Sequence, residues 1–224
     1  MPMNILPWDL GAIPSRFFLF GEAAWYTVQI TGLGVLLGLV IGLLVALGRL
    51  STNKPLSAVA RAYIFLIRGT PLLVQLFIVY YGLTSVVTIA PIPSAVIALG
   101  VHNGAYIAEI FRGSIQSIHY GQMEAARSLG MPKGKAMRRI ILPQAFKRAV
   151  PSLGNQLIIA LKDSSLASTI AVPELMLRGR QMGSSTFMYM EMFVIVGIWY
   201  LLMTSVLSYV IHRIETRLKV SDRD

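Results

Sequence analysis

Charged and polar side chains interrupt several long apolar segments of this chain, and they are its first candidates for chemistry. In one segment Asp163 follows Lys162 and precedes Ser164 and Ser165. A charge at the centre of a bilayer costs at least ~2.5 kcal/mol, so a carboxylate in such a segment indicates a functional polar cavity. Asp163 could meet an ammonium or guanidinium group there, with the serines adding hydrogen bonds. It could equally pair with Lys162, although adjacent residues of a helix point about 100° apart.

Asn103 and Glu109 form a second polar group in another apolar segment. They are six residues apart, about 240° of helix rotation, so they cannot both face one point. We expect Asn103 to line a cavity. Glu109 has two expected roles, a ligand contact or an ion pair with Arg68 or Arg112. His102 is expected to pack rather than bind a metal, because no second histidine or carboxylate stands at ligand spacing.

The run Gly69-Thr70-Pro71 interrupts a third apolar segment. Proline has no N–H and disrupts the helix before it, so backbone groups around this break lose their partners within the helix. Such groups can meet the carboxylate or ammonium of a ligand. Thr70 and the nearby Gln75 are therefore candidate ligand contacts.

A short polar segment, Glu124-Ala125-Ala126-Arg127-Ser128-Leu129-Gly130, has the character of a docking element. We expect a helix that begins just after Gly121, places Glu124 in its first turn and stops at Gly130 and Pro132. About two turns of helix are marginal alone in water, so tertiary packing or a partner must hold them. The small Ala125, Ala126 and Gly130 leave room for close approach. A basic helix lying on lipid is the alternative, but the segment lacks the broad apolar face that such helices show.

Composition indicates an all-α integral membrane protein. Hydrophobic residues make up 55% of the 224 residues, charged residues 13%, and the mean hydropathy is +0.65. Soluble domains carry roughly 25% charged residues. The net charge of +10 does not indicate nucleic-acid binding, because the basic residues lie between apolar spans. The chain contains no cysteine, which excludes disulfides and thiolate metal sites.

Five membrane spans are expected in a single domain of residues 1–224. At about 1.5 Å per residue, twenty residues cross the ~30 Å hydrocarbon layer. Residues 1–21 are expected to form an interfacial segment around Trp8, Phe17 and Phe18, and glycines at 34, 38 and 42 to serve helix packing within the subunit or against a partner. The expected spans are Val28 to Leu47, Tyr63 to Leu83, Ile92 to Ile110, Ala149 to Val172, and Met192 to Ile211.

The distribution of lysine and arginine predicts the orientation. Fifteen of these residues follow the first span, lie in the loop of residues 113–148 or belong to the tail, whereas three (Arg16, Arg178 and Arg180) lie on the opposite side. Positive residues are enriched in cytoplasmic loops. The N-terminus is therefore expected outside the cell and the C-terminus in the cytoplasm.

The polar segment resembles the EAA loop of membrane subunits of ATP-driven (ABC) importers. That pattern is Glu-Ala-Ala, three residues, Gly, nine residues and then Ile-any-Leu-Pro, which Glu124 to Gly130 and Ile140-Ile141-Leu142-Pro143 match. Three further stretches resemble the polar amino-acid branch of these bacterial permeases. They are Arg68 to Gln75, Gly104 to Gly113, and Leu161 to Leu166.

This resemblance implies a type I importer permease fold in the bacterial cytoplasmic (inner) membrane. It implies a cytoplasmic ATPase dimer that docks on Glu124, Ala125, Ala126 and Gly130, a second permease subunit in a homodimer or close heterodimer, and an amino-acid-binding protein outside. The substrate is then a polar amino acid, with a cationic one (arginine, lysine or histidine) favoured by Asp163 and Glu109, and with glutamine, glutamate or an opine as the alternative. ATP and magnesium would bind to the ATPase, because this chain has no phosphate-binding Gly-x-x-x-x-Gly-Lys-[Ser/Thr] loop.

Two other classes explain the intramembrane polar residues less well. A carrier driven by an ion gradient would hold carboxylates, but it has no use for a docking helix and usually shows internal repeats. A serine hydrolase could use Ser164 or Ser168 with His102, but the chain has no Gly-x-Ser-x-Gly elbow.

Overall fold

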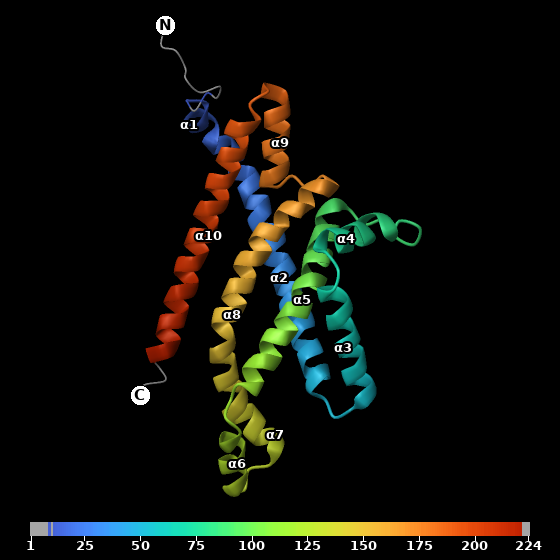
Figure 1. The fold of residues 1–224 in the computed structure, drawn as a ribbon, viewed down its shortest axis with the longest axis vertical. Coiled ribbons are helices and arrows are strands. Elements are labelled where there is room, and N and C mark those ends of the chain that lie inside the picture. Colours follow the sequence, from blue (N-terminus) through green and yellow to red (C-terminus); the bar gives the residue numbers. More distant parts are fainter. Residues whose placement is uncertain (1–8, 10, 221–224) are drawn as a thin grey trace.

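The computed structural model describes residue 9 and residues 11–220, and every regular element among them is helical. Long helices run roughly alongside one another, and a short helical protrusion, α6 with α7, extends beyond one end (Figure 1). In chain order the elements are α1 (Ala12–Phe17), η1 (Phe18–Phe20), α2 (Gly21–Leu50), α3 (Lys54–Arg68), α4 (Leu72–Phe77), η2 (Ile78–Gly82), α5 (Pro91–Gln116), α6 (Tyr120–Ser128), α7 (Lys133–Ala136), η3 (Met137–Ile141), α8 (Leu142–Asp163), η4 (Ser164–Ile170), α9 (Leu175–Thr186) and α10 (Tyr189–Val220).

Three helical stretches among the described residues are long and apolar enough to cross a membrane: Ala12–Leu50, Pro91–Gln116 and Tyr189–Leu218. They contain the expected first, third and fifth spans. The expected fourth span corresponds to α8 and η4, which are not among the described helices that are long and apolar enough to cross a membrane. Its helix starts earlier than expected, at Leu142, and it accommodates Pro151 within its length.

The expected second span is a bent pair of helices. α3 and the stretch Leu72–Gly82 meet at 104° across the break at Gly69-Thr70-Pro71. The Pro71 backbone is extended, with ψ of 140°, which ends α3 and starts α4 in a new direction. The break predicted from the sequence is therefore a sharp bend in the backbone.

Small residues allow α2 and α5 to pack closely. A Cβ placed on Gly34 would lie 2.8 Å from the Leu99 Cβ, and one placed on Gly42 would lie 2.6 Å from the Ile107 Cγ2. A glycine of α5 likewise makes room for a side chain of α2, because a Cβ on Gly100 would lie 2.6 Å from the Leu37 Cδ2. These distances are too short for any side chain, so the glycine pattern of the first span serves packing within the subunit.

The N-terminal helix packs on the start of α10. The rings of Phe17 and Trp199 stack with centroids 4.9 Å apart, and the Trp199 Nε1 donates to the Phe17 carbonyl at 3.1 Å. Phe18, by contrast, is 83% exposed. Trp8, the third aromatic residue of the expected interfacial segment, lies outside the described residues.

Candidate functional site

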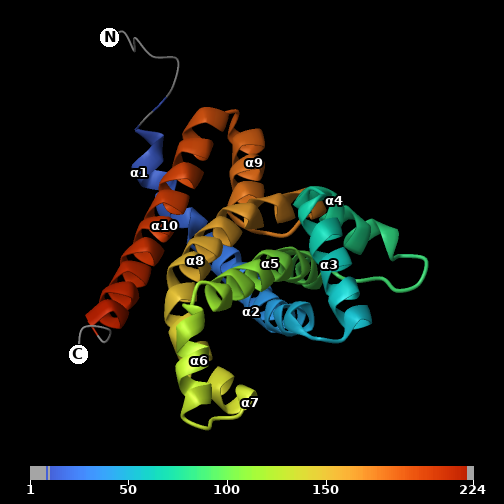
Figure 2. The same cartoon turned by 60° about the horizontal axis from the view of Figure 1, so that its bottom comes forward.

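The short polar helix predicted from the sequence is α6, and α6 with α7 projects from the rest of the chain (Figure 2). It begins at Tyr120, earlier than expected, because the His119 side chain caps it by accepting from the Gly121 N–H at 3.2 Å. Glu124 consequently lies in the second turn, where the expected attraction to the helix dipole is weaker. The expectation that Glu124 occupies the first turn was wrong.

Gly130 ends α6 in the way the sequence predicts. Its φ is +79°, a left-handed conformation that glycine adopts without steric cost. The Gly130 N–H donates to the Arg127 carbonyl at 2.9 Å, and the Met131 N–H donates to the Ala126 carbonyl at 3.1 Å. These two bonds make a complete Schellman motif, which satisfies carbonyls that the helix end leaves open.

The residues of α6 divide into an inner and an outer set. Ala126 is buried, whereas Glu124 and Ala125 are exposed. Leu129 is 84% exposed at the tip of the helix. Sequence reasoning missed this leucine, although an apolar residue directly before a helix-terminating glycine was a usable signal. The outer face therefore offers a carboxylate, a small residue and an apolar side chain to a partner.

The base of the protrusion is braced by α8. The Arg148 guanidinium donates to the carbonyl and the hydroxyl oxygen of Ser117, the residue that caps the end of α5. A small apolar cluster of Ile118, Ile141 and Ala145 packs beneath it. The base of the α6–α7 protrusion is thus fixed to the end of α5 and the start of α8.

Gln75 and Thr70 hold the bend between α3 and α4. The Gln75 Nε2 donates to the Ile67 carbonyl at 2.8 Å and to the Thr70 Oγ1 at 2.9 Å. The Gln75 Oε1 lies 3.1 Å from the His102 Nδ1, which therefore donates to it. The side-chain amide of Gln75 thus provides a hydrogen-bond donor for a backbone carbonyl at the break, that of Ile67. Thr70 is exposed at the surface of the bend.

Asn103 does not line a cavity. Its side chain is fully buried between helices, where its Nδ2 donates to the Leu99 carbonyl and its Oδ1 accepts from the Gln156 Nε2, both at 2.8 Å. The close approach of α2 and α5 seals this position, because a Cβ on Gly38 would lie 3.1 Å from the Asn103 Cβ. The expectation that Asn103 is cavity-lining was wrong.

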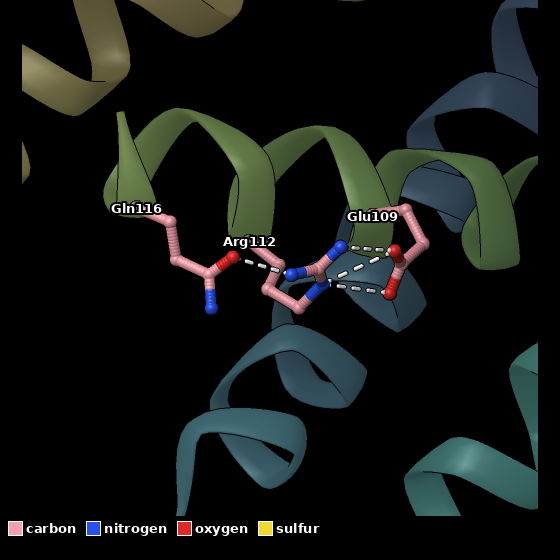
Figure 3. A network of polar contacts seen from close by, with 3 residues as sticks. All are labelled: Glu109, Arg112 and Gln116. Carbon is pink, nitrogen blue, oxygen red and sulfur yellow. Dashed lines mark hydrogen bonds and ion pairs between the residues drawn. The ribbon is translucent and has the colours of Figure 1, made fainter. Parts of the chain in front are cut away.

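Glu109 forms the ion pair that was one of its two expected roles. Figure 3 shows Arg112 one turn along α5, with its guanidinium against both carboxylate oxygens. The Arg112 Nη2 lies 2.7 Å from the Glu109 Oε2, and its Nε donates to both oxygens at 3.0 and 3.1 Å. Arg112 also donates to Gln116, so it links three residues along one face of α5.

Asp163 ends α8, where the chain tightens into η4. Its carboxylate is partly exposed and makes no hydrogen bond or ion pair within 4 Å with the described residues. Ser165 is also partly exposed, whereas Ser164 is fully buried and donates to the Leu161 carbonyl at 2.7 Å. The element that follows Asp163 packs against the bent helix, because Ala167 and Ile170 share an apolar cluster with residues of α4.

Sequence reasoning missed Glu174, which lies just beyond the expected fourth span. Its fully buried carboxylate caps α9 by accepting from the N–H groups of Met176 and Leu177 at 2.8 and 2.7 Å. The Tyr200 hydroxyl donates to it at 3.2 Å and also interacts with Ser164. Burial raises the pKa of Glu174 to about 7, against the lowering effect of these hydrogen bonds. A helix cap signal, Pro-Glu before an apolar run, could have identified it.

Comparison with known proteins defines the class. Residues 38–220 match the family described as the binding-protein-dependent transport system inner membrane component, so the chain belongs to that family. An amino acid ABC transporter crystallised with histidines has a chain of the same fold, with a TM-score of 0.90 and 39% identity over 95% of this chain and 100% of that one. The protein is an amino-acid ABC importer permease with a type I fold.

Relatives across nearly the full length are permease proteins for different amino acids. The L-cystine transport system permease TcyB of Bacillus subtilis (strain 168) is 41% identical, over 95% of this chain and 92% of its own length. The glutamine transport system permease GlnP of Escherichia coli (strain K12) is 39% identical, over 96% and 100%. The arginine transport system permease ArtQ of B. subtilis is 37% identical, over 94% and 96%.

Proposed function

We propose that this permease carries a cationic amino acid across the inner membrane, driven by a cytoplasmic ATPase that docks on α6. The observation that carries the substrate class is Asp163, a partly buried carboxylate without a hydrogen-bonding partner among the described residues. A carboxylate in a membrane-embedded position is costly unless a cation meets it. An ammonium or guanidinium of the substrate is such a cation, with Ser165 beside it to add a hydrogen bond.

The roles of the other polar residues in this proposal follow from their contacts. Gln75 and Thr70 shape the bend whose second arm, α4, packs against η4, and the exposed Thr70 hydroxyl is the one of the two that can reach a ligand. Glu109 is neutralised by its ion pair with Arg112 and has a structural role in the cytoplasmic half of α5. Asn103 is retained only as a packing residue.

The alternative substrate class is glutamine, glutamate or an opine. Relatives named for glutamine and for nopaline favour it, the second being 38% identical. A zwitterionic substrate also carries an α-ammonium group, so Asp163 would then meet that group instead of a side chain. The discriminating measurement is calorimetric binding of each amino acid to the partner binding protein.

Substrate contact is tested by Asp163→Asn in proteoliposomes that contain the complete complex, with binding protein saturating outside and ATP inside. The change removes the charge and keeps the size. A bonded charge commonly contributes ~1.5 to 3 kcal/mol, so initial uptake of the labelled cation should fall about 10-fold or more. Glu22→Gln, the same carboxylate-to-amide change at an exposed position of α2, is the matched control. Normal uptake by Asp163→Asn would leave that residue a structural role only.

Coupling is tested by Glu124→Lys and Gly130→Asp. Glu124 is exposed on α6 and Gly130 is exposed just after its end, so the subunit should insert normally while the ATPase detaches or hydrolyses ATP without transport. Wild-type recovery of the ATPase with Gly130→Asp, together with normal uptake, would contradict docking at α6. The sequence has no catalytic motif for nucleotide, so ATP and magnesium belong to the ATPase in this proposal.

The proposed arrangement pairs two permease subunits and places the C-terminus in the cytoplasm. A second subunit is supported by the small number of candidate spans among the described residues, three or four, which are few to enclose a path across the membrane. Crosslinking the purified complex tests for a homodimer or a heterodimer. A reporter fused after Asp224 should be active only in the cytoplasm and one inserted at Thr88 only outside, and the reverse result would overturn the orientation.

A further inference from the structure

A basic hollow of about 480 Å³ lies between the ends of α2 and α3 and the side of α5. Three arginines from two helices line it, with one carboxylate: Arg49, Arg61, Arg68 and Glu109. Arg61 and Arg68 are seven residues apart, two turns of one helix, so they lie on the same face about 10 Å from each other. Positive charge therefore outweighs negative charge in this hollow.

The contacts of these side chains leave capacity for an anion. The Arg68 guanidinium lies over the Tyr106 ring, 5.1 Å from its centroid, and the Arg61 Nη1 donates to the Ser57 hydroxyl at 3.3 Å. A guanidinium has five N–H donors, so most of them stay available in both residues. The one carboxylate of the hollow is already held by Arg112 through both of its oxygens.

The surroundings of the hollow are those of a membrane-facing site. Phe65 in its wall is 78% exposed, and Leu66 beside it is 60% exposed. The last turns of α2 leading to Arg49 expose Leu44 by 64% and Leu47 by 53%. The connection between α2 and α3, the two helices that carry the arginines, lies toward the end of the molecule from which α6 and α7 project (Figure 1). An anion that brings its own apolar chains fits this combination better than a soluble anion.

We infer that this hollow binds the phosphate headgroup of an anionic membrane lipid, whose acyl chains lie along the exposed leucines of α2 and Phe65. Arginine presents a planar fork of donors that matches a phosphate group, and basic pockets between helices on the cytoplasmic side bind such headgroups. Arg49 and Arg68 hold the phosphate from two helices, and Arg61 adds a third positive charge. The bound lipid would fasten the end of α3 to α2 and α5.

The test uses the purified transporter complex in mixed micelles and native mass spectrometry of retained lipid. Phosphatidylglycerol should remain bound to wild type in preference to phosphatidylcholine. The double variant Arg49→Gln, Arg68→Gln should retain at least about 10-fold less lipid, because it removes the two guanidinium groups that hold the phosphate. Arg217→Gln, an exposed arginine at the end of α10, is the control and should behave as wild type.

Equal retention by the double variant and wild type would overturn the proposal, as would an equal loss in Arg217→Gln. Displacement of the lipid by inorganic phosphate at similar concentration would show a free-phosphate site and also overturn it. Loss of the ATPase without loss of lipid would assign the arginines to a protein partner. If the double variant does not assemble, Arg61→Gln alone should lower retention severalfold, since its only described bond is to Ser57.

Discussion

The α2–α5 interface and the α6–α7 protrusion both depend on glycine and alanine, for opposite physical reasons. Between α2 and α5, glycine is required because the partner helix occupies the space of a side chain. In α6, Gly130 has open space around it and is required only for its backbone angle. In the first region small residues let two helices pack tightly. In the second they leave the surface of the protrusion free of large side chains. Changes in the first should therefore cost stability, and changes in the second should cost association.

The largest loss of stability is expected for Gly42→Leu. Even a Cβ at this position would lie 2.6 Å from the Ile107 Cγ2, so a leucine must force the two helices apart. Overpacking typically costs 1 to 3 kcal/mol, and we expect about 3 kcal/mol or more here. The measurement is the thermal unfolding temperature of the purified subunit in detergent. A Cβ on Gly32, on the same helix, would meet nothing within 4 Å, so Gly32→Leu should leave the unfolding temperature unchanged. An equal loss in both variants would contradict the role of close packing at Gly42.

Glu174→Gln should remove a dependence of stability on pH. The pKa of this carboxyl is about 7 in the folded chain and about 4.5 when unfolded. Between these values the folded state keeps a proton that the unfolded state has lost, so stability falls as pH rises from about 4.5 to about 7, by at most ~1.4 kcal/mol per pH unit. The unfolding temperature should be higher at pH 5 than at pH 8 in wild type and in the exposed-site control Glu22→Gln. If this difference persists in Glu174→Gln, the pH dependence belongs to another group.

Gly130→Ala should have a smaller and local effect. Alanine in the left-handed region costs roughly 1 to 2 kcal/mol, which loosens the end of α6 without touching the bundle. Hydrogen exchange at the amides of Gly130 and Met131 should speed up, while the unfolding temperature of the whole subunit stays the same. Gly134→Ala, which also has open space but no positive φ, is the control. Faster exchange across α2 as well would show that the two regions are coupled in stability.

Leu129→Ser should have the smallest effect on stability and a clear effect on association. The side chain is 84% exposed, so its removal costs the isolated subunit little. Burial of a leucine against a partner contributes about 1.5 to 3 kcal/mol, so affinity for the ATPase should fall about 10-fold or more. Titration of the purified ATPase against the permease in nanodiscs measures it, and an unchanged affinity would remove Leu129 from the docking face.

Local sequence signals predicted the elements of this protein well. The glycine repeat in α2, the stop at Gly130 and the break at Gly69-Thr70-Pro71 each depend on short-range backbone chemistry, which the sequence displays directly. The long apolar helices follow from composition and length in the same way. The prediction of Glu109 as an ion-pair partner of Arg112 was also accessible, because residues three apart on a helix are neighbours.

Only the tertiary structure decided which polar residues are free to act. Asn103, Gln75 and Asp163 look alike in the sequence, as polar groups in apolar segments. Packing gives Asn103 the amide of Gln156 and gives Gln75 the carbonyls of the bend, whereas it leaves Asp163 without a hydrogen-bonding partner among the described residues. The same holds for Glu174, whose carboxylate meets the start of α9 and the Tyr200 hydroxyl of α10. A sequence fixes which groups need partners, but partners come from segments far apart in the chain, and only the fold brings those together.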